Sequence, residues 1–403
     1  MAEHEQVAID ALPDQLWDTV IIGGGPAGAI CALVLARDGH RVLVIDRHRF
    51  PRHKACGDLL IPDSLTVLDR VRLLDRVNRA AHSIRRIRVF SPSRVEFEVA
   101  GRYLALKRYY LDAHLMQAAV EAGATLAKAA ACTVEPSADS PAAVRLADSS
   151  LILRSRTVVA ATGADIEIPQ KLRMIDHPTA SAVAIRKYVK SAIPIEDIIL
   201  SYDRSLVPGY AWIIPVEEGE FNVGCGVRLR DGKSKTPNLK KMLRGFLASF
   251  PLGRELERTA TDQSKITGAA LRCSLVGCRR IVKDNLVLVG EVIGTTFPLT
   301  GEGIGKAMHT GELAAKAVSE ALRTGDPSKL EAYPRAVKQE VAPRYEGYLR
   351  AERWLSFPWL NDFLARRAGR SPYLRGEMER FVAETGDPRS AFGLSGVLKS
   401  FWK

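Results

Sequence analysis

The stretch DTVIIGGGPAG, residues 18–28, joins a short apolar run to a glycine-rich turn. Its first part, DTVIIG at 18–23, is β-branched and apolar, which predicts a buried strand. The Ala- and Leu-rich stretch AGAICALVLARDG at 27–39 predicts a helix that ends at Gly39, and RVLVIDR at 41–47 predicts a second strand. Strand, glycine turn, helix and strand within about 30 residues are typical of a right-handed βαβ unit.

The glycine-rich turn contains the G-x-G-x-x-G pattern, and Asp46 follows 18 residues beyond its last glycine, at the end of the second strand. Glycines let the backbone approach a pyrophosphate closely, and the start of the helix offers free N–H groups to the anion. The Asp46 carboxylate is placed to accept hydrogen bonds from an adenosine ribose. The pattern alone fits either NAD or FAD. The predicted dinucleotide site consists of Gly23, Gly25, Pro26, Ala27, Gly28, Asp46 and Arg47.

The rest of the chain predicts a discontinuous two-domain body. Short β-type runs separated by Gly, Pro and charged turns fill residues 170–280, whereas NLVLVGE at 285–291 returns to the buried-strand pattern and precedes a long helix. We therefore expect a dinucleotide-binding domain from residues 14–75, 107–165 and 280–325, a sheet-rich substrate domain from 76–106 and 166–279, and a C-terminal helical region at 326–403.

Composition narrows the class of protein. Hydrophobic residues make up 46% and charged residues 26%, as in an ordinary globular protein, and the six cysteines show no C-x-x-C pair. No histidine has metal-ligand spacing, so no metal is expected. The net charge of +12 is dispersed without a nucleic-acid-binding module, which predicts no nucleic-acid partner and at most peripheral membrane contact. With no signal peptide or apolar run of membrane-spanning length, the expected location is the cytoplasm.

Three further segments carry a resemblance to a known family: FPRHKACGD at 50–58, YAWIIP at 210–215 and PLTGEGI at 298–304. Together with the glycine-rich turn, they make residues 17–325 resemble the geranylgeranyl-reductase-like family of FAD-dependent oxidoreductases. That family belongs to the superfamily of p-hydroxybenzoate hydroxylase and the flavin-dependent halogenases. The resemblance implies FAD as the cofactor. It also implies a Rossmann-like α/β FAD-binding domain of the p-hydroxybenzoate hydroxylase type, with a sheet-rich α+β substrate domain and a C-terminal helical extension.

The resemblance also implies site residues. Cys56 matches a position beside the isoalloxazine ring, and Tyr210 and Trp212, which alternate on a predicted strand, match the border of the substrate cavity. We take these three as the candidate catalytic residues. The family has Gly-Asp where this chain has Gly290-Glu291, so Glu291 is expected to serve with a longer side chain. The remaining flavin contacts that we expect are Lys54, Cys56, Gly57, Arg108, Gly163, Glu291, Pro298, Gly301, Gly303 and Ile304.

The reaction stays open between several uses of one scaffold. Reduction of an alkene in a prenyl or similar apolar chain is the leading expectation, because the sequence motifs at 54–57 and 298–304 resemble those of the reductases. The alternative is a monooxygenase that uses a C4a-hydroperoxide on a small-molecule or protein-bound substrate. A halogenase or a flavoprotein accessory factor comes third. No second dinucleotide fingerprint occurs, so NADPH binds transiently or a reduced electron-carrier protein supplies electrons.

Overall fold

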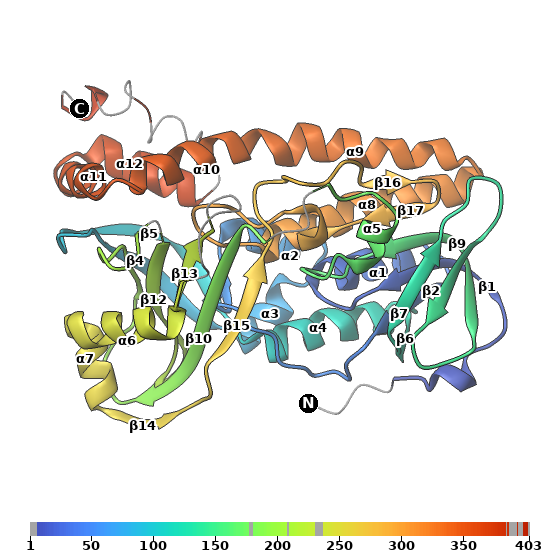
Figure 1. Ribbon diagram of the computed structural model, residues 1–403, viewed down its shortest axis with the longest axis horizontal. Coiled ribbons are helices and arrows are strands. Elements are labelled where there is room, and N and C mark those ends of the chain that lie inside the picture. The colour runs from blue at the N-terminus through green and yellow to red at the C-terminus, as the bar shows by residue number, and fades with distance from the viewer. Residues whose placement is uncertain are drawn as a thin grey trace.

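The computed structural model describes residues 6–176, 180–207, 209–229, 237–383, 385–386, 393 and 398–401. Two mixed sheets form the body of the protein, and helices cover them (Figure 1). This arrangement confirms the expected α/β class with a sheet-rich second part and C-terminal helices. Among the described residues, no helix combines the length and the hydropathy needed to span a membrane.

The first sheet has a parallel core in the order β17-β9-β1-β2-β6. All five residues of β2 are buried, as expected for a parallel strand covered on both faces. The antiparallel pair β7-β8 extends β9 on one side, and β16 pairs with β17. The strands are β1 (Leu16–Ile22), β2 (Val42–Asp46), β6 (Thr125–Lys128), β7 (Ala131–Glu135), β8 (Ala142–Leu146), β9 (Ile152–Ala160), β16 (Val282–Lys283) and β17 (Leu286–Leu288).

Helix α1 (Pro26–Arg37) connects β1 to β2 and confirms the predicted βαβ unit. It is buried on almost every side because α4 (Arg108–Glu121) and α8 (Ile304–Thr324) also pack against it. The contact with α8 is very close: a Cβ at Gly311 would lie 2.2 Å from the carbonyl oxygen of Ala27. Glycine at position 311 therefore allows the two helices to meet, and α8 is fixed relative to the turn that precedes α1.

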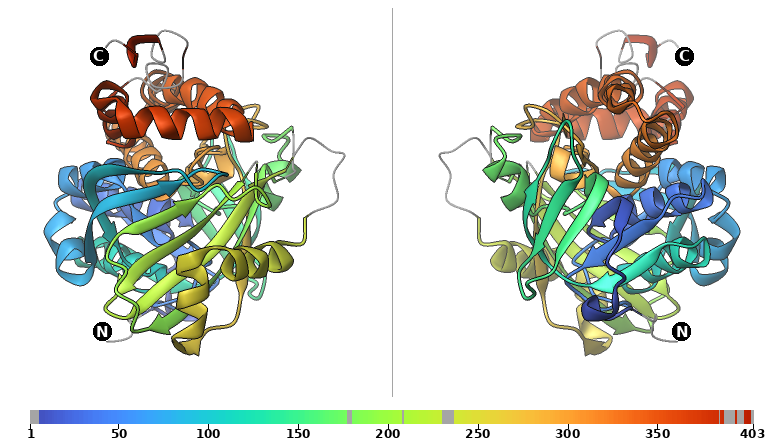
Figure 2. Two further views of the ribbon diagram at one scale, coloured as in Figure 1. Left: turned by 90° about the vertical axis from the view of Figure 1, so that its left-hand side faces the viewer. Right: turned by 90° about the vertical axis from the view of Figure 1, so that its right-hand side faces the viewer.

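The second sheet is mostly antiparallel, in the order β14-β10-β13-β12-β11-β4-β5-β3, with β15 also paired to β10. Helices α6 (Leu239–Ser249) and α7 (Pro251–Arg258) cover one face of it (Figure 2). The strands are β3 (Leu59–Leu60), β4 (His82–Phe90), β5 (Glu96–Ala105), β10 (Ala182–Ser191), β11 (Ile198–Ser201), β12 (Gly209–Glu217), β13 (Glu220–Arg228), β14 (Ala260–Gln263) and β15 (Thr267–Leu271).

The predicted domain segments map onto these sheets with one difference. Every strand of the first sheet comes from residues 14–75, 107–165 or 280–325, and the second sheet takes its strands from 76–106 and 166–279. Strand β3, which lies in the first of the predicted segments, instead pairs with β5 in the second sheet. The division into domains stays a prediction.

The C-terminal helices lie across the top of the molecule in Figure 1 and reach the second sheet. Ala368, Leu374 and Met378 pack against β4 and β5, and the Asp362 carboxylate accepts hydrogen bonds from both Ser91 and Ser93 in the turn between those strands. The helical segments that complete the fold are α2 (Pro62–Arg70), α3 (Leu74–Ala80), α5 (Glu167–Lys171), α9 (Ala332–Ala336), the π-helical turn η4 (Val337–Val341), α10 (Ala342–Leu355), α11 (Pro358–Arg370) and α12 (Pro372–Val382), with 3-10 turns η1 (Ile9–Ala11), η2 (Gly290–Ile293) and η3 (Pro327–Glu331).

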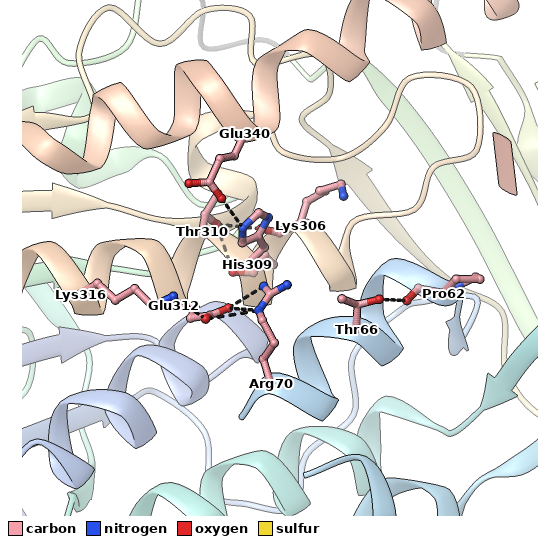
Figure 3. Close-up of polar contacts among 10 residues, drawn as sticks. Pro62, Thr66, Arg70, Lys306, His309, Thr310, Glu312, Lys316 and Glu340 are labelled. Carbon is pink, nitrogen blue, oxygen red and sulfur yellow. Dashed lines mark hydrogen bonds and ion pairs between the residues drawn. The ribbon is translucent and has the colours of Figure 1, made fainter. Parts of the chain in front are cut away.

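Polar contacts tie α8 to its neighbours on both sides (Figure 3). The Glu312 carboxylate accepts hydrogen bonds from Arg70 of α2, with a shortest distance of 2.6 Å, and from Lys316 one turn further along α8. On the other side of the helix, His309 Nε2 lies 3.4 Å from a Glu340 oxygen in η4. Helix α8, whose first residue lies at the candidate site, is thus held from both directions.

Candidate flavin and substrate site

A cavity of about 460 Å³ is lined by residues of both sheets. It is bordered by the turn before α1, the segment 52–61, the segment 298–304 and the strands β10 to β13. All the predicted site residues except Gly28 line it. Gly28 instead packs beneath the turn, where a Cβ would lie 1.9 Å from the carbonyl oxygen of Gly23. Its role is therefore close packing of the helix on the strand, as the G-x-G-x-x-G pattern predicts.

The start of α1 is open to a ligand. Gly25 caps the helix without a side-chain hydrogen bond, and Gly23 has φ of 103°, a conformation that favours glycine. A Cβ at Gly25 would meet only the Nη2 atoms of Arg52 and Arg108, at 3.7 and 3.9 Å. Two guanidinium groups thus lie close beside the helix N-terminus, and their planar, charged donors suit a pyrophosphate.

Both arginines are oriented by one fully buried carboxylate, Asp112. Arg108 donates from Nε and Nη2 to the two oxygens of Asp112, at 2.6 and 2.8 Å, and Arg52 Nη1 lies 3.1 Å from Oδ2. The Nε atom of Arg52 is buried and has no hydrogen-bond partner among the described residues. Arg108 was predicted from the sequence, but Arg52 was not, although it lies within the quoted segment 50–58.

Asp46 lies at the end of β2, as predicted, and faces the same cavity. Its Oδ2 accepts a hydrogen bond from the Gly24 N–H and its Oδ1 accepts one from the His48 N–H, both at 2.9 Å. These contacts fix the carboxylate beside the turn. Arg47, in contrast, is exposed at the rim and forms an ion pair with Asp165 at 3.5 Å.

Glu291 lies on the opposite side of the turn, beside Gly163. A Cβ at Gly163, which has φ of 69°, would be 3.9 Å from Glu291 Oε2. Burial raises the pKa of Glu291, while the charge of Lys54 acts in the opposite direction. The predicted strand 285–291 ends early, at Leu288, and Glu291 belongs to the 3-10 turn η2. Glu291 therefore lines the cavity from a turn and not from a strand end.

The other end of the cavity brings the three candidate catalytic residues together. The rings of Tyr210 and Trp212 are 5.9 Å apart on β12, and both face the cavity, as their alternation predicts. The Tyr210 hydroxyl donates a hydrogen bond to the Thr300 carbonyl, next to Gly301. Cys56 lines the same space, where burial and the charge of Asp58 raise the pKa of its thiol and Arg108 opposes them.

A buried carboxylate that the sequence reasoning missed holds this end of the cavity in place. Asp58 has positive φ of 62° and is fully buried. Its Oδ2 accepts hydrogen bonds from the Tyr188 hydroxyl at 2.6 Å and from the Asn222 amide at 2.7 Å. The same amide donates to the Cys56 carbonyl at 2.8 Å, and the Trp212 indole donates to Asn222 Oδ1 at 2.9 Å. One network therefore fixes both Cys56 and Trp212.

Beyond Trp212 the cavity wall is largely apolar and includes the C-terminal helices. Ile87, Leu200 and Ile214 contribute from the second sheet, and Leu355 and Phe381 from α10 and α12. The sequence predicted these helices but not their place at the cavity. Within the part of the chain that the structure describes, no group of three His, Cys, Asp or Glu side chains could hold a metal ion. His177 and the other residues outside the described ranges are not included.

Fold and site together define the class of this protein as an FAD-dependent oxidoreductase. Residues 17–344 match the FAD binding domain family. Menaquinone reductase of Mycobacterium tuberculosis (strain ATCC 25618 / H37Rv) is 31% identical over 319 residues, which cover 75% of this chain and 76% of that protein. Digeranylgeranylglycerophospholipid reductase of Methanoculleus marisnigri is 29% identical over 330 residues, which cover 78% and 79%.

Solved structures show the same fold. A geranylgeranyl bacteriochlorophyll reductase-like protein from Thermoplasma acidophilum aligns with a TM-score of 0.77 at 20% identity over 96% of both chains. A flavin-dependent brominase aligns with a TM-score of 0.76 at 19% identity, over 96% of this chain and 98% of its own. The chain belongs to the FAD binding domain family and, within it, to the geranylgeranyl-reductase-like group that the three sequence segments indicated.

Proposed function

We propose that this protein is an FAD-dependent reductase that saturates a carbon–carbon double bond in the prenyl chain of an apolar substrate. The observation that carries the proposal is the continuity of one cavity from the arginine-flanked start of α1 to an apolar wall beyond Trp212. The names of the relatives support it, since the two reductases described above are named for a prenylated quinone and for geranylgeranyl chains of a lipid.

In this proposal the N-terminal turn and two arginines hold FAD. The N–H group of Ala27 and the guanidinium groups of Arg52 and Arg108 would bind the pyrophosphate, and Asp46 would bind the adenosine ribose. Bound and reduced, FAD supplies a hydride. The segment 298–304 lies against Tyr210 and leads into α8, so the N–H groups of that helix start can stabilise negative charge on the flavin ring.

Saturation of a double bond adds a hydride to one carbon and a proton to the other. Cys56 is the group that we propose as the proton donor, because its raised pKa keeps the thiol protonated at neutral pH and it lines the cavity. The thiolate left on Sγ faces the buried cation of Arg108, which stabilises the negative charge until the thiol takes up a proton again. Tyr210 and Trp212 orient the prenyl chain, and the apolar wall excludes water.

Product analysis tests this proposal. The FAD-loaded protein is incubated with dithionite as reductant and a digeranylgeranyl glycerophospholipid or a short-chain menaquinone, and the prenyl chain is analysed by fragment mass spectrometry after the quinone ring has been reoxidised. The expected product has gained two hydrogen atoms in the chain. An intact chain, or a chain that carries an added oxygen atom in the presence of air, would overturn the proposal in favour of a different substrate or of oxygenation.

A further inference from the structure

The far end of the cavity is closed by a part of the chain that the family match does not include. The match ends at residue 344, whereas Tyr348, Glu352 and Leu355 of α10 and Phe381 and Val382 of α12 all line the cavity. Helices α11 and α12 are held on the second sheet by the Asp362 contacts and by apolar packing, and α10 packs against Phe297. A wall of this kind is positioned to decide which substrates this particular protein accepts.

One charged pair stands in this otherwise apolar wall. Arg228, at the end of β13, donates from Nη1 to Oε2 of Glu352. The side chain of Glu352 is 11% exposed and that of Arg228 is 31% exposed, and both residues line the cavity. The other carboxyl oxygen, Oε1, is buried and has no hydrogen-bond partner among the described residues. A buried polar atom without a partner costs free energy, so its presence in a cavity wall points to a partner that arrives with the ligand.

The surroundings of the pair indicate what kind of ligand group fits. Tyr202, directly after β11, lies beside it, with its ring 5.8 Å from that of Tyr210, and Leu355 follows one turn of helix after Glu352. Burial raises the pKa of Glu352 to about 7, while Arg228 opposes the rise. At neutral pH the pair therefore offers guanidinium donors and a carboxyl that is protonated in part of the molecules.

We infer that Arg228 and Glu352 bind an uncharged oxygen-bearing head group, a carbonyl or hydroxyl oxygen, at the end of an otherwise apolar substrate. The inference rests on the proposed function for the prenyl chain and adds the class of its head group. The apolar wall accommodates the hydrocarbon, and the pair supplies the hydrogen bonds that distinguish an oxygenated head from a bare one. Such a pair adds specificity more than stability, because a buried ion pair is a weak stabiliser of a fold.

The competing explanation is that the pair only latches α10 onto β13. The two explanations differ in what they predict for ligands. A latch affects all ligands of the cavity equally, since its loss loosens the wall. A head-group site affects only the ligand that has the oxygen atoms.

A pair of probes separates these outcomes. Geranyl-substituted menadione and the same molecule without its two carbonyl oxygens, a geranyl methylnaphthalene, are titrated into the oxidised FAD-loaded protein, and the perturbed flavin absorbance gives each Kd. We expect the quinone to bind about tenfold more tightly than the hydrocarbon to the wild type, in line with one or two hydrogen bonds to a charged group. In the double variant Arg228→Met/Glu352→Leu, the ratio should fall to about twofold or less, because apolar side chains replace both partners.

Glu320→Gln is the matched control, because it removes an exposed ion pair with Arg323 on α8, outside the cavity lining. It should leave the ratio unchanged. An unchanged ratio in the double variant, or an equal loss of affinity for both probes, would overturn the inference. FAD content and melting temperature are measured for each variant.

A second variant keeps the test valid if the double variant fails to fold. Glu352→Gln keeps the size of the side chain and an N–H donor but does not titrate. The groups that face Glu352 are Arg228 of β13, Tyr202 directly after β11, and Cys273. The pKa of Glu352 is raised to about 7, so its carboxyl group loses its proton as the pH rises from 6 to 8. We therefore expect the affinity of the wild type for the quinone to fall over this range and that of Glu352→Gln to stay constant. Identical pH profiles would overturn the inference.

Failure of the proposed function gives a different result. Binding is measured with oxidised flavin and without turnover. If the protein selects the quinone through Arg228 and Glu352 but leaves prenyl chains intact, the head-group site stands and the proposed reductase function is wrong. If the protein saturates prenyl chains but its selectivity does not depend on the pair, the reductase function stands and the head-group site is wrong.

Discussion

At the scale of single residues, the arrangement of Arg52, Arg108 and Asp112 explains how a buried anion site is prepared before its ligand binds. Asp112 takes two hydrogen bonds from Arg108 and leaves the rest of both guanidinium groups directed at Gly25. Asp46 lies 3.7 Å from Arg52 Nη2, so two carboxylates balance the charges of the two arginines. The donors that remain on the two guanidinium groups, among them the unused Arg52 Nε, favour a pyrophosphate.

Replacing Arg52 tests this site. We expect Arg52→Met to raise the Kd for FAD by about 10- to 100-fold, because one charge-assisted hydrogen bond contributes about 1.5–3 kcal/mol. Arg76→Met, which removes an exposed pair with Glu121, is the control and should leave the Kd unchanged. Retention of full FAD affinity by Arg52→Met, measured by fluorescence titration of the apoprotein, would contradict the assignment.

Asp58 provides a second test at this scale, of positioning and not of binding. In Asp58→Asn an amide N–H₂ replaces one of the two oxygens that accept from Tyr188, Asn222 and the Arg108 N–H. At least one donor then faces another donor. We expect a loss of about 1–3 kcal/mol in the free energy of unfolding and a lower turnover rate with nearly unchanged FAD affinity. Unchanged denaturant midpoints would show that the network does not hold the site.

Glu352 gives a prediction about pH and stability. Its pKa is raised from 4.5 to about 7 in the folded protein, so the folded state binds the proton more tightly than the unfolded state. Stability from this group is therefore greatest below pH 4.5 and is lost as the pH rises through 7. Between pH 4.5 and pH 7 and above, the wild type should therefore lose unfolding free energy relative to Glu352→Gln. A difference that is flat with pH would contradict the raised pKa.

The sequence identified many of these residues because they belong to local patterns. Gly23, Gly25 and Asp46 were predicted from their spacing within one βαβ unit, and Cys56 and Trp212 were predicted because their segments resemble motifs of a known family. Asp58 and Glu352 did not follow, since their roles depend on partners more than 100 residues away in the chain: Asn222 lies 164 residues from Asp58, and Arg228 lies 124 residues from Glu352. Periodicity shows that a side chain is buried, but it does not show against what.

At the scale of elements, the sequence likewise predicts helices and strands better than it predicts where they pack. The buried strands β1 and β2 and the helix α1 were predicted close to their observed positions, and a long helix, α8, follows residues 285–291 as predicted, because their apolar patterns are strong. Helices α10 to α12 were predicted as helical, but their position over the cavity was not. Helices α11 and α12 contact β5, whereas α10 packs against Phe297 through Tyr345 and Tyr348, and nothing in the sequence of these helices specifies either surface.

Helix α8 offers a test of how an element is held in place. Burial acts to raise the pKa of Glu312, but the hydrogen bonds and charges of Arg70 and Lys316 outweigh it, and the pKa lies below its usual value (Figure 3). We expect Glu312→Gln to lower the free energy of unfolding at neutral pH by about 1 kcal/mol, a modest value because the Arg70 side chain is 41% exposed.

The sign of its pH dependence follows from the lowered pKa. The stabilisation is present above 4.5, the usual pKa of a glutamate, and is lost as the pH falls through the pKa of the folded protein. The difference between wild type and Glu312→Gln should therefore shrink in acid. Glu320→Gln, on the same helix, is the control, and an equal effect of both variants in urea melts would show that the link to α2 adds nothing.

At the scale of the whole molecule, two sheets with different connections share one cavity. The parallel sheet provides the glycine-rich turn and Asp46, the second sheet provides Tyr210 and Trp212, and the C-terminal helices close the far end. Because each part alone is incomplete, we expect cofactor and substrate to meet only in the assembled chain. The net charge of +12 does not identify a partner, since a basic surface attracts several kinds of anionic molecule. The identity of the electron donor stays a prediction.

The most direct test of the reductase assignment is an anaerobic half-reaction. The FAD-loaded protein is reduced with one equivalent of dithionite and mixed with geranylgeraniol, whose head group is an uncharged hydroxyl, or with its fully saturated counterpart as the control, while the flavin absorbance is recorded. We expect the flavin to be reoxidised by the unsaturated alcohol and to stay reduced with the saturated one. A flavin that stays reduced with both alcohols and is reoxidised only when oxygen is admitted would contradict the reductase assignment.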